Sequence, residues 1–343
     1  MSEVEVFLDD TPGEVRGVVM KDGRYDRLIL QRETDPPEHR LGARSIGRVT
    51  DAGSAFGAAF VDLGGAGQAG MLRPAKGETL KVGELVEVEV TAEPRETKGP
   101  VLRRVGPGEG RARLLTPGPD VEQWLSAAAP GAEIVCGADA IRASLEAEEE
   151  ALATRQLHSE WALDLAVQRT RALIAVDIDY AHLAGRDARK GRAQANRQGL
   201  RQAARKIRLN GWGGLVVVDL VGTMLDSAQV TAMAKEAFAG DEAQMGPLSR
   251  FGLLQLALPW RRRPVEEILN GPGGRPTPET GAIDLARRLK LALSSDTSAA
   301  RVVASCATDM VERAAPLVAR LGPRAALVAD PALASGRFAI KEG

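Results

Sequence analysis

The feature of the sequence that most constrains the fold is a pair of short apolar runs that each end in acid. The first run covers residues 172–179 (ALIAVDID), and the second covers residues 213–220 (GGLVVVDL). The segment between them is polar, strongly basic and long enough for a helix. Two apolar runs that flank such a segment predict a β-α-β unit with parallel strands. A connection of this kind is right-handed and lays its helix over the sheet.

Three aspartates lie at or near the ends of these two predicted strands. Asp177 and Asp179 are two residues apart, so their side chains point to the same face of the first strand, and Asp219 lies near the end of the second. Open α/β sheets place their active sites at this edge. Mg²⁺ and Mn²⁺ prefer carboxylate ligands, and a cation would relieve the repulsion between the acids. The pattern therefore predicts a divalent metal site, with helix or loop capping by the aspartates as the alternative.

The segment between the two runs predicts a basic helix at about residues 192–209. From Gly185 to Asn210 there are nine Lys or Arg residues and one acid. Like charges at helical spacing repel one another, so a phosphate-binding role would explain their arrangement, and a solvated helix face is the alternative. Four arginines fall on one predicted face of this helix: Arg197, Arg201, Arg205 and Arg208.

The first third of the chain is typical of short strands joined by turns. Residues 4–31 alternate as two or three strands, with a hairpin turn at Lys21-Asp22-Gly23. Five short strands with glycine-rich turns fit a small OB-type barrel, which presents aromatic and basic side chains to single-stranded nucleic acid. Phe60 and Lys98 are candidates for that role, and the alternative for Phe60 is a place in the barrel core. The five strands are predicted at residues 45–49, 58–62, 69–73, 85–91 and 101–104.

The remaining segments predict a helical connector and a small C-terminal α/β unit. Amphipathic helices are expected at residues 121–127 and 138–156, and a Gly/Pro-rich linker at residues 270–278. The C-terminal unit is expected to have helices at residues 282–294 and 308–321 and strands at residues 300–305 and 325–329. The predicted divisions are N-terminal strands (1–37), barrel (38–107), connector (108–162), α/β core (163–269), and linker with small domain (270–343).

Composition limits the classes of partner and compartment. The chain of 343 residues has a formal net charge of −1, so a polyanion would have to be bound by local clusters of cations. Its 2 cysteines do not form a CxxC motif, which argues against a cysteine zinc site or a disulfide framework. No apolar run approaches the ~20 residues that span a bilayer, so no membrane association is expected. Because the first residues also lack a hydrophobic signal core, we expect a cytoplasmic location.

Several motifs, in chain order, resemble the catalytic core of the ribonuclease E/G family. RALIAVDID (171–179) is similar to the family's aspartate-bearing IDxN strand, and AARKIRLNGWGGLVVVDL (203–220) to the end of its Asn-led basic helix and the IVIDF strand that follows. Asn196 and SRFGLLQL (249–256) complete this match. Flanking segments extend it to an S1-type barrel, the ribonuclease-H-like strands before it and a small C-terminal domain. These segments are GAAFVDLG (57–64), EPRETKGP (93–100), the strands of residues 4–30, and ADPALASGRFAI (329–340).

The resemblance implies both a fold and an activity. The fold would be a ribonuclease-H-like/deoxyribonuclease-like α/β core with an inserted S1-type OB barrel and a small C-terminal α/β domain. Asp177 and Asp219 correspond to the family's magnesium-binding catalytic aspartates, and Phe60 and Lys98 to RNA-contacting residues. The implied activity is endonucleolytic cleavage of single-stranded RNA by water that Mg²⁺ (or Mn²⁺) activates, leaving a 5′-phosphate, in RNA processing or decay.

The sequence departs from the family pattern at positions near the expected site. Asp179 stands where the family has Asn, and Gly222 falls near the second aspartate of the family's IDFIDM strand. Met71 takes the place of the barrel's second aromatic residue, and Gln255 that of the Glu in SRFGLLEM. These changes leave open a catalytically weak or inactive RNA-binding protein, and a nuclease that acts on DNA is a third possibility.

Two further departures concern assembly and regulation. No CPxC motif lies between Arg263 and Thr277, so the zinc link between protomers is expected to be absent. We therefore expect no zinc, and a monomer or weak homodimer. The connector is short, which predicts that the family's pocket for a 5′-monophosphate is missing.

Overall fold

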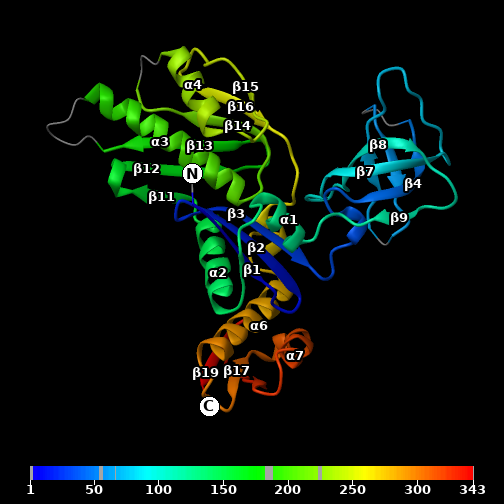
Figure 1. Cartoon of the computed structure of the whole chain (residues 1–343), viewed down its shortest axis with the longest axis vertical. Helices are drawn as coiled ribbons and strands as arrows, with labels where there is room; N and C mark the ends of the chain where they lie inside the picture. Colours follow the sequence, from blue (N-terminus) through cyan, green and yellow to red (C-terminus); the bar gives the residue numbers. More distant parts are fainter. Residues whose placement is uncertain (1–2, 54–56, 66, 182–187, 223–225, 343) are drawn as a thin grey trace. The chain divides into compact units, whose positions relative to one another are not determined.

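The computed structural model describes residues 3–53, 57–65, 67–181, 188–222 and 226–342, and Figure 1 follows them from blue to red. The chain divides into two units, each assembled from separate segments. Unit 1 comprises Met1–Arg24, Leu28–Glu148 and Arg262–Gly343, and unit 2 comprises Tyr25–Arg27 and Glu149–Arg261. The predicted five-part division by sequence range stays a prediction.

Unit 2 contains the expected β-α-β unit within a mixed six-stranded sheet. The strand order is β11-β12-β13-β14-β16-β15, and β13 and β14 are parallel neighbours, as predicted. The helix α3 that joins them begins earlier than expected, at Ala188. The bounds are β11 (Arg155–His158), β12 (Leu163–Arg169), β13 (Ile174–Tyr180), α3 (Ala188–Leu209), β14 (Gly214–Asp219), α4 (Ser227–Ala237), β15 (Gln244–Met245) and β16 (Leu254–Leu258).

The two faces of this sheet have different surroundings. Val176 and Val218 point into the core, where residues of α3 and α4 such as Leu200 and Met233 are also buried. Side chains alternate along a strand, so the residues between them point the other way. On that other face Asp177, Asp219 and Gln255 are exposed to solvent, and we call it the open face of the sheet.

The barrel of unit 1 confirms the five predicted strands. The ring runs β4-β5-β6-β8-β7 and closes by pairing of β7 with β4, which gives a five-stranded OB-like barrel. Its core is aliphatic and includes Val49, Val61, Leu72 and Val88. The bounds are β4 (Arg44–Asp51), β5 (Ala59–Asp62), β6 (Gly70–Leu72), β7 (Leu85–Ala92), β8 (Val101–Pro107) and an extra strand β9 (Arg113–Thr116) that pairs with β4.

A second sheet of unit 1, in the order β10-β1-β2-β3, contains the predicted N-terminal hairpin. Asp22 and Gly23 both have positive φ angles (49° and 70°), as the tight turns that suit twisted hairpins require. Helix α1 packs closely on this sheet, because a Cβ atom at Gly17 would lie 2.6 Å from Val121 Cγ1. The bounds are β1 (Val4–Asp9), β2 (Glu14–Lys21), β3 (Arg24–Arg32), α1 (Val121–Ala128), β10 (Ile134–Val135) and α2 (Ala138–Leu152).

The C-terminal part of unit 1 is the predicted small α/β unit with one strand that the sequence reading missed. Strand β17 pairs in parallel with β18 and antiparallel with β19, which lies in the tail. No helix of the described residues is both long and apolar enough to cross a membrane. The bounds are α5 (Val265–Leu269), α6 (Pro278–Ser295), β17 (Val302–Cys306), α7 (Val311–Ala319), β18 (Ala325–Ala329) and β19 (Phe338–Glu342), with short 3₁₀ turns at Pro37–His39, Ser159–Trp161 and Thr308–Met310.

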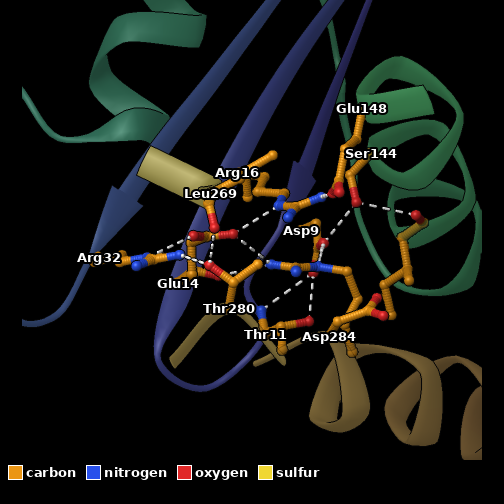
Figure 2. A network of polar contacts seen from close by, with 12 residues as sticks. Asp9, Thr11, Glu14, Arg16, Arg32, Ser144, Glu148, Leu269, Thr280 and Asp284 are labelled. Atoms are coloured by element: carbon orange, nitrogen blue, oxygen red, sulfur yellow. Dashed lines mark hydrogen bonds and ion pairs between the residues drawn. The ribbon is translucent and has the colours of Figure 1, made fainter. Parts of the chain in front are cut away.

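A buried charge network joins four elements of unit 1, β1, β2, β3 and α6 (Figure 2). Arg287 of α6 is fully buried and forms ion pairs with Asp9 (2.6 Å) and Glu14 (3.1 Å) at the β1–β2 turn. Arg16 and Arg32 contact the same Glu14 carboxylate at 2.7 and 3.0 Å. Burial alone would raise the pKa of Glu14, but the three guanidinium groups outweigh that effect and lower it to about 2.

The network extends to helix α2, one of the two amphipathic helices predicted for the connector. Glu148 on α2 pairs with Arg16 at 2.5 Å, and Ser144 donates a hydrogen bond to Asp9 at 2.7 Å. Figure 2 shows these side chains converging with Thr280, whose hydroxyl donates to the Leu269 carbonyl. Part of the acidic helix is therefore structural, since buried carboxylates are stable only when paired.

Candidate functional site

Asp177 and Asp219 are direct neighbours on the open face. The pairing of β13 with β14 places the Cα atoms of these two residues in register. Adjacent strands lie about 4.8 Å apart, and register partners in a parallel pair share a face. Both side chains are exposed. The predicted meeting of the two strand ends is thus confirmed.

The surroundings of this carboxylate pair fit a divalent cation. Neither carboxylate has a hydrogen bond or ion pair with another residue that the structure describes. Two adjacent carboxylates without a cationic partner repel each other, and Mg²⁺ is commonly held by one or two carboxylates together with water. Among the described residues no group of three or more His, Cys, Asp or Glu side chains is arranged to hold a metal. The candidate metal ligands that the described residues supply on this face are therefore the carboxylates of Asp177 and Asp219.

Asp179 shares the face of Asp177 but has different neighbours. It lies beyond the last residue of β14, and its register partner is Asp164 on β12. Its Oδ1 accepts a hydrogen bond from the backbone N–H of Tyr180 at 2.7 Å. Asp164 is itself bound by Arg155, with Nε 2.8 Å from Oδ1. A metal-binding role of Asp179 stays a prediction, and the strand register brings only Asp177 next to Asp219.

Asn196 on α3 fixes the chain just after Asp219, a role that the sequence reading did not assign. Its side chain is buried, and its Oδ1 accepts from the N–H of Val221 at 2.8 Å while its Nδ2 donates to the Val221 carbonyl at 3.0 Å. This two-bond clamp holds the backbone two residues past the carboxylate. An amide side chain is required because it must donate and accept at once.

Gly222 and Asp226 lie in the segment where the family pattern has its second aspartate. Gly222 has φ +113°, a conformation in which other residues are strained. Asp226 is the N-cap of α4, and its Oδ1 accepts from the N–H groups of Ala228 (2.9 Å) and Gln229 (3.3 Å). Asp226 therefore caps the helix that follows it.

The arginines of α3 fall into two groups along the helix. Arg197 and Arg201, the two nearer its N-terminus, are exposed, and Arg201 pairs with Glu236 on α4. Arg205 is only 7% exposed and donates to the carbonyl of Tyr25 at 2.7 Å. It also pairs with Glu150 at 2.6 Å. From Gln202 onward the helix is covered by other parts of unit 2, so its polar side chains there are not a solvated face.

Arg208 and Lys206 complete this internal set of contacts. Arg208 pairs with Asp26 and Asp241, each at 2.8 Å. Burial would lower the pKa of Arg208, but the two carboxylates raise it. Lys206 is 1% exposed and donates to the carbonyls of Glu150 and Ala151 at the end of α2. RNA binding by the four arginines stays a prediction, and Arg205 and Arg208 have partners within the fold.

The barrel carries a separate set of candidate residues in unit 1. Phe60 and Met71 are register partners on β5 and β6. Ala59, Val61 and Leu72 beside them are buried, so Phe60 and Met71 point outward and Phe60 is not a core residue. Lys98 is exposed in the β7–β8 hairpin, where its N–H donates to the Arg95 carbonyl at 2.9 Å. The structure thus pairs Phe60 with Met71 and leaves Lys98 in a loop.

Comparisons with known proteins agree with the motifs of the core. Residues 138–263 match the model of the Ribonuclease E/G family. A protein of Arabidopsis thaliana, "Ribonuclease E/G-like protein, chloroplastic", is 27% identical over 135 residues, which cover 37% of this chain and 14% of that protein. The chain therefore matches only a small part of this relative's length. The residues matched by the family model include Asp177, Asp219 and the whole of α3, and over them the resemblance is confirmed.

Proposed function

We propose that this chain, whose residues 138–263 match the ribonuclease E/G family, is a divalent-metal-dependent endoribonuclease acting on single-stranded RNA. The observation that carries the proposal is the adjacency of Asp177 and Asp219 on the open face. Two unpaired carboxylates on neighbouring strands are costly to keep together without a cation. We assign the reaction to RNA processing or decay in the cytoplasm, with products that carry a 5′-phosphate.

Asp177 and Asp219 would hold Mg²⁺ or Mn²⁺ through their carboxylates. When bound, such an ion lowers the pKa of water and stabilises charge that develops on a phosphoryl group. Asn196 acts as a positioning residue, because it fixes the backbone of Val221 beside Asp219. We propose that the six-stranded core corresponds to the deoxyribonuclease-like part of the family's fold.

The barrel and the exposed arginines of α3 would bind the RNA. Phe60 offers an aromatic face for base stacking, and Met71 beside it offers an apolar contact. Lys98, Arg197 and Arg201 would contact phosphates, which supply the salt-dependent part of the affinity. We restrict the proposed contacts on α3 to Arg197 and Arg201, because both are exposed, whereas Arg205 and Arg208 are largely covered and paired within unit 2.

A cleavage assay tests the proposal. Purified full-length protein with Mg²⁺ is expected to cut an unstructured RNA, to stop when a chelator is added, and to resume with Mn²⁺. Asp219→Asn is expected to abolish cutting while RNA binding persists, because the barrel contacts remain. If the RNA stays uncut under all these conditions, or if Asp219→Asn cleaves it at the wild-type rate, the proposed nuclease activity is refuted.

The second candidate is an RNA-binding protein with little or no catalysis. It is favoured by the donor set, since no third metal-binding side chain joins the aspartate pair among the described residues. This candidate predicts that wild type and Asp219→Asn bind RNA equally and that neither cuts it. A competition between RNA and DNA of the same sequence separates both candidates from a nuclease that acts on DNA.

A further inference from the structure

Phe251 is the most exposed of the large apolar side chains that the structure describes. Its relative exposure is 74%, and it lies in the turn that leads into β16. A phenylalanine gains about 2 kcal/mol or more from burial, and the ring of Phe251 forgoes most of that gain. Single exposed apolar residues are common, so a role for this ring depends on how it is held and on what lies beside it.

The turn that carries Phe251 is held in a fixed conformation. The N–H of Ser249 donates to the Leu253 carbonyl at 2.9 Å, and the N–H of Gly252 donates to the Ser249 carbonyl at 3.0 Å. The Ser249 hydroxyl oxygen accepts from the N–H groups of Phe251 (3.3 Å) and Leu253 (3.1 Å). Gly252 has φ +81°, which favours glycine. The ring is therefore presented to solvent by a turn with its own hydrogen bonds.

A cation accompanies the exposed ring. The guanidinium carbon of Arg250 lies 4.7 Å from the ring centroid of Phe251, within the range of a cation–π contact. Arg250 is itself exposed. An aromatic face beside an arginine suits an unpaired nucleotide, since the base stacks on the ring and the phosphate meets the guanidinium group.

The strand register places this turn at the carboxylate edge of the sheet. Val218 of β14 pairs with Leu254 of β16, so Asp219 and Leu253 are the next residues at that edge. Phe251 is two residues beyond Leu253, which is at most about 7 Å of chain. All these residues belong to unit 2. A strand of RNA with a phosphate at Asp219 would have a nearby nucleotide within reach of the ring.

We infer that Phe251 is a base-stacking residue for single-stranded RNA, with Arg250 as its phosphate contact, and that it sets where the strand lies relative to Asp177 and Asp219. This inference rests on the proposed function, because it needs an RNA at the open face. It adds a contact that lies on the nuclease core itself, separate from those of the barrel.

The test measures RNA binding without cleavage. A fluorescently labelled unstructured RNA of about ten nucleotides is titrated with full-length protein in an Asp219→Asn background. Phe251→Ala is expected to weaken binding roughly tenfold, in line with the loss of one stacked base, and Phe251→Trp to preserve it. Val328→Ala removes another exposed apolar side chain, in the C-terminal sheet of unit 1, and is expected to change nothing.

A set of RNAs that each lack one base shows whether the ring meets a base. If it does, Phe251→Ala weakens the binding of every RNA in the set except one, the RNA that lacks the base which stacks on the ring. If Phe251→Ala weakens the binding of every RNA equally, or does not weaken the binding of the intact RNA, the inference is overturned. The proposed nuclease activity is unaffected by either result. A dimer in sedimentation that Phe251→Ala dissociates overturns it too, since the ring would then be a contact between copies. No RNA binding by the background protein removes the proposed function, and this inference with it.

Discussion

Asp177 and Asp219 occupy the same level of two neighbouring parallel strands, although the whole of α3 separates them in the chain. The right-handed β-α-β connection creates this adjacency, because it returns the chain to the sheet in the same direction. Asn196, on the connecting helix, then fixes the backbone beyond Asp219. The crossover therefore supplies both the carboxylate pair and the group that positions one of its members.

The register predicts that two aspartates on β13 differ in importance. Asp177→Asn is expected to slow RNA cleavage by at least about a hundredfold, since even outer groups of metal sites matter by about 10- to 100-fold. Asp179→Asn is expected to stay within a few-fold of wild type, because its carboxylate lies past the end of β14. Initial rates at saturating Mg²⁺ check this. Asp164→Asn, at the register partner of Asp179 on the same face, serves as the control, and equal losses for Asp177 and Asp179 would contradict the two-carboxylate site.

The pair of Phe60 and Met71 predicts a gain of affinity from a single substitution. Met71→Phe puts a second aromatic ring opposite the first on the outside of the barrel, and is expected to tighten RNA binding by several-fold through added stacking. Phe60→Leu is expected to weaken it by a similar factor. Titration of a labelled RNA measures both changes. Unchanged affinity in both variants would show that this face of the barrel does not meet RNA.

The arginines of α3 are predicted to separate in their dependence on salt. Arg197→Ala is expected to reduce the slope of log affinity against log salt by about 0.7, the value for one phosphate contact of a single strand. Arg208→Met is expected to leave that slope unchanged and to lower the free energy of unfolding by about 3 kcal/mol, because Asp26 and Asp241 each lose an ion pair with Arg208. Binding at several salt concentrations and urea unfolding distinguish the two. A smaller slope of log affinity against log salt in Arg208→Met would indicate that Arg208 contacts RNA.

The Glu14 network predicts loss of stability in acid. The folded pKa of Glu14, about 2, lies below its ordinary value of 4.5, so its stabilising effect is complete above pH 4.5 and is lost as the pH falls toward 2. The size of this effect is on the order of 3 kcal/mol. Urea unfolding at a series of pH values measures it.

Two substitutions separate Glu14 from other carboxylates. Glu14→Gln is expected to destabilise the protein at neutral pH, since Arg16, Arg32 and Arg287 lose a buried partner, and to flatten the acid response. Glu242→Gln changes an exposed carboxylate that pairs with Arg261, and is expected to do neither. An unchanged acid response in Glu14→Gln would place the sensitivity elsewhere.

The sequence alone indicated the barrel strands, the N-terminal hairpin and the central β-α-β unit, in chain order. Alternation with period two predicted the barrel strands and the N-terminal hairpin, and acid-tipped apolar runs predicted β13 and β14 as parallel neighbours. These signals are local. A strand or helix that buries one face carries apolar residues at a regular spacing along the sequence. Strand β19 is not predicted from the sequence, because its residues form a strand only by pairing with β17.

The tertiary structure decided which polar groups face solvent. Four arginines at helical spacing look equivalent in sequence, yet Arg205 and Arg208 are held by Tyr25, Asp26, Glu150 and Asp241 while Arg197 and Arg201 remain exposed. The same holds for the acids, since Asp219 meets Asp177 and Asp226 caps a helix. The acid-tipped runs specified two strands and the helix between them. Only the packing of distant segments distinguished the charges that stabilise the fold from those that remain exposed to solvent. The reason is that the partners of each charged side chain come from residues far away in the chain.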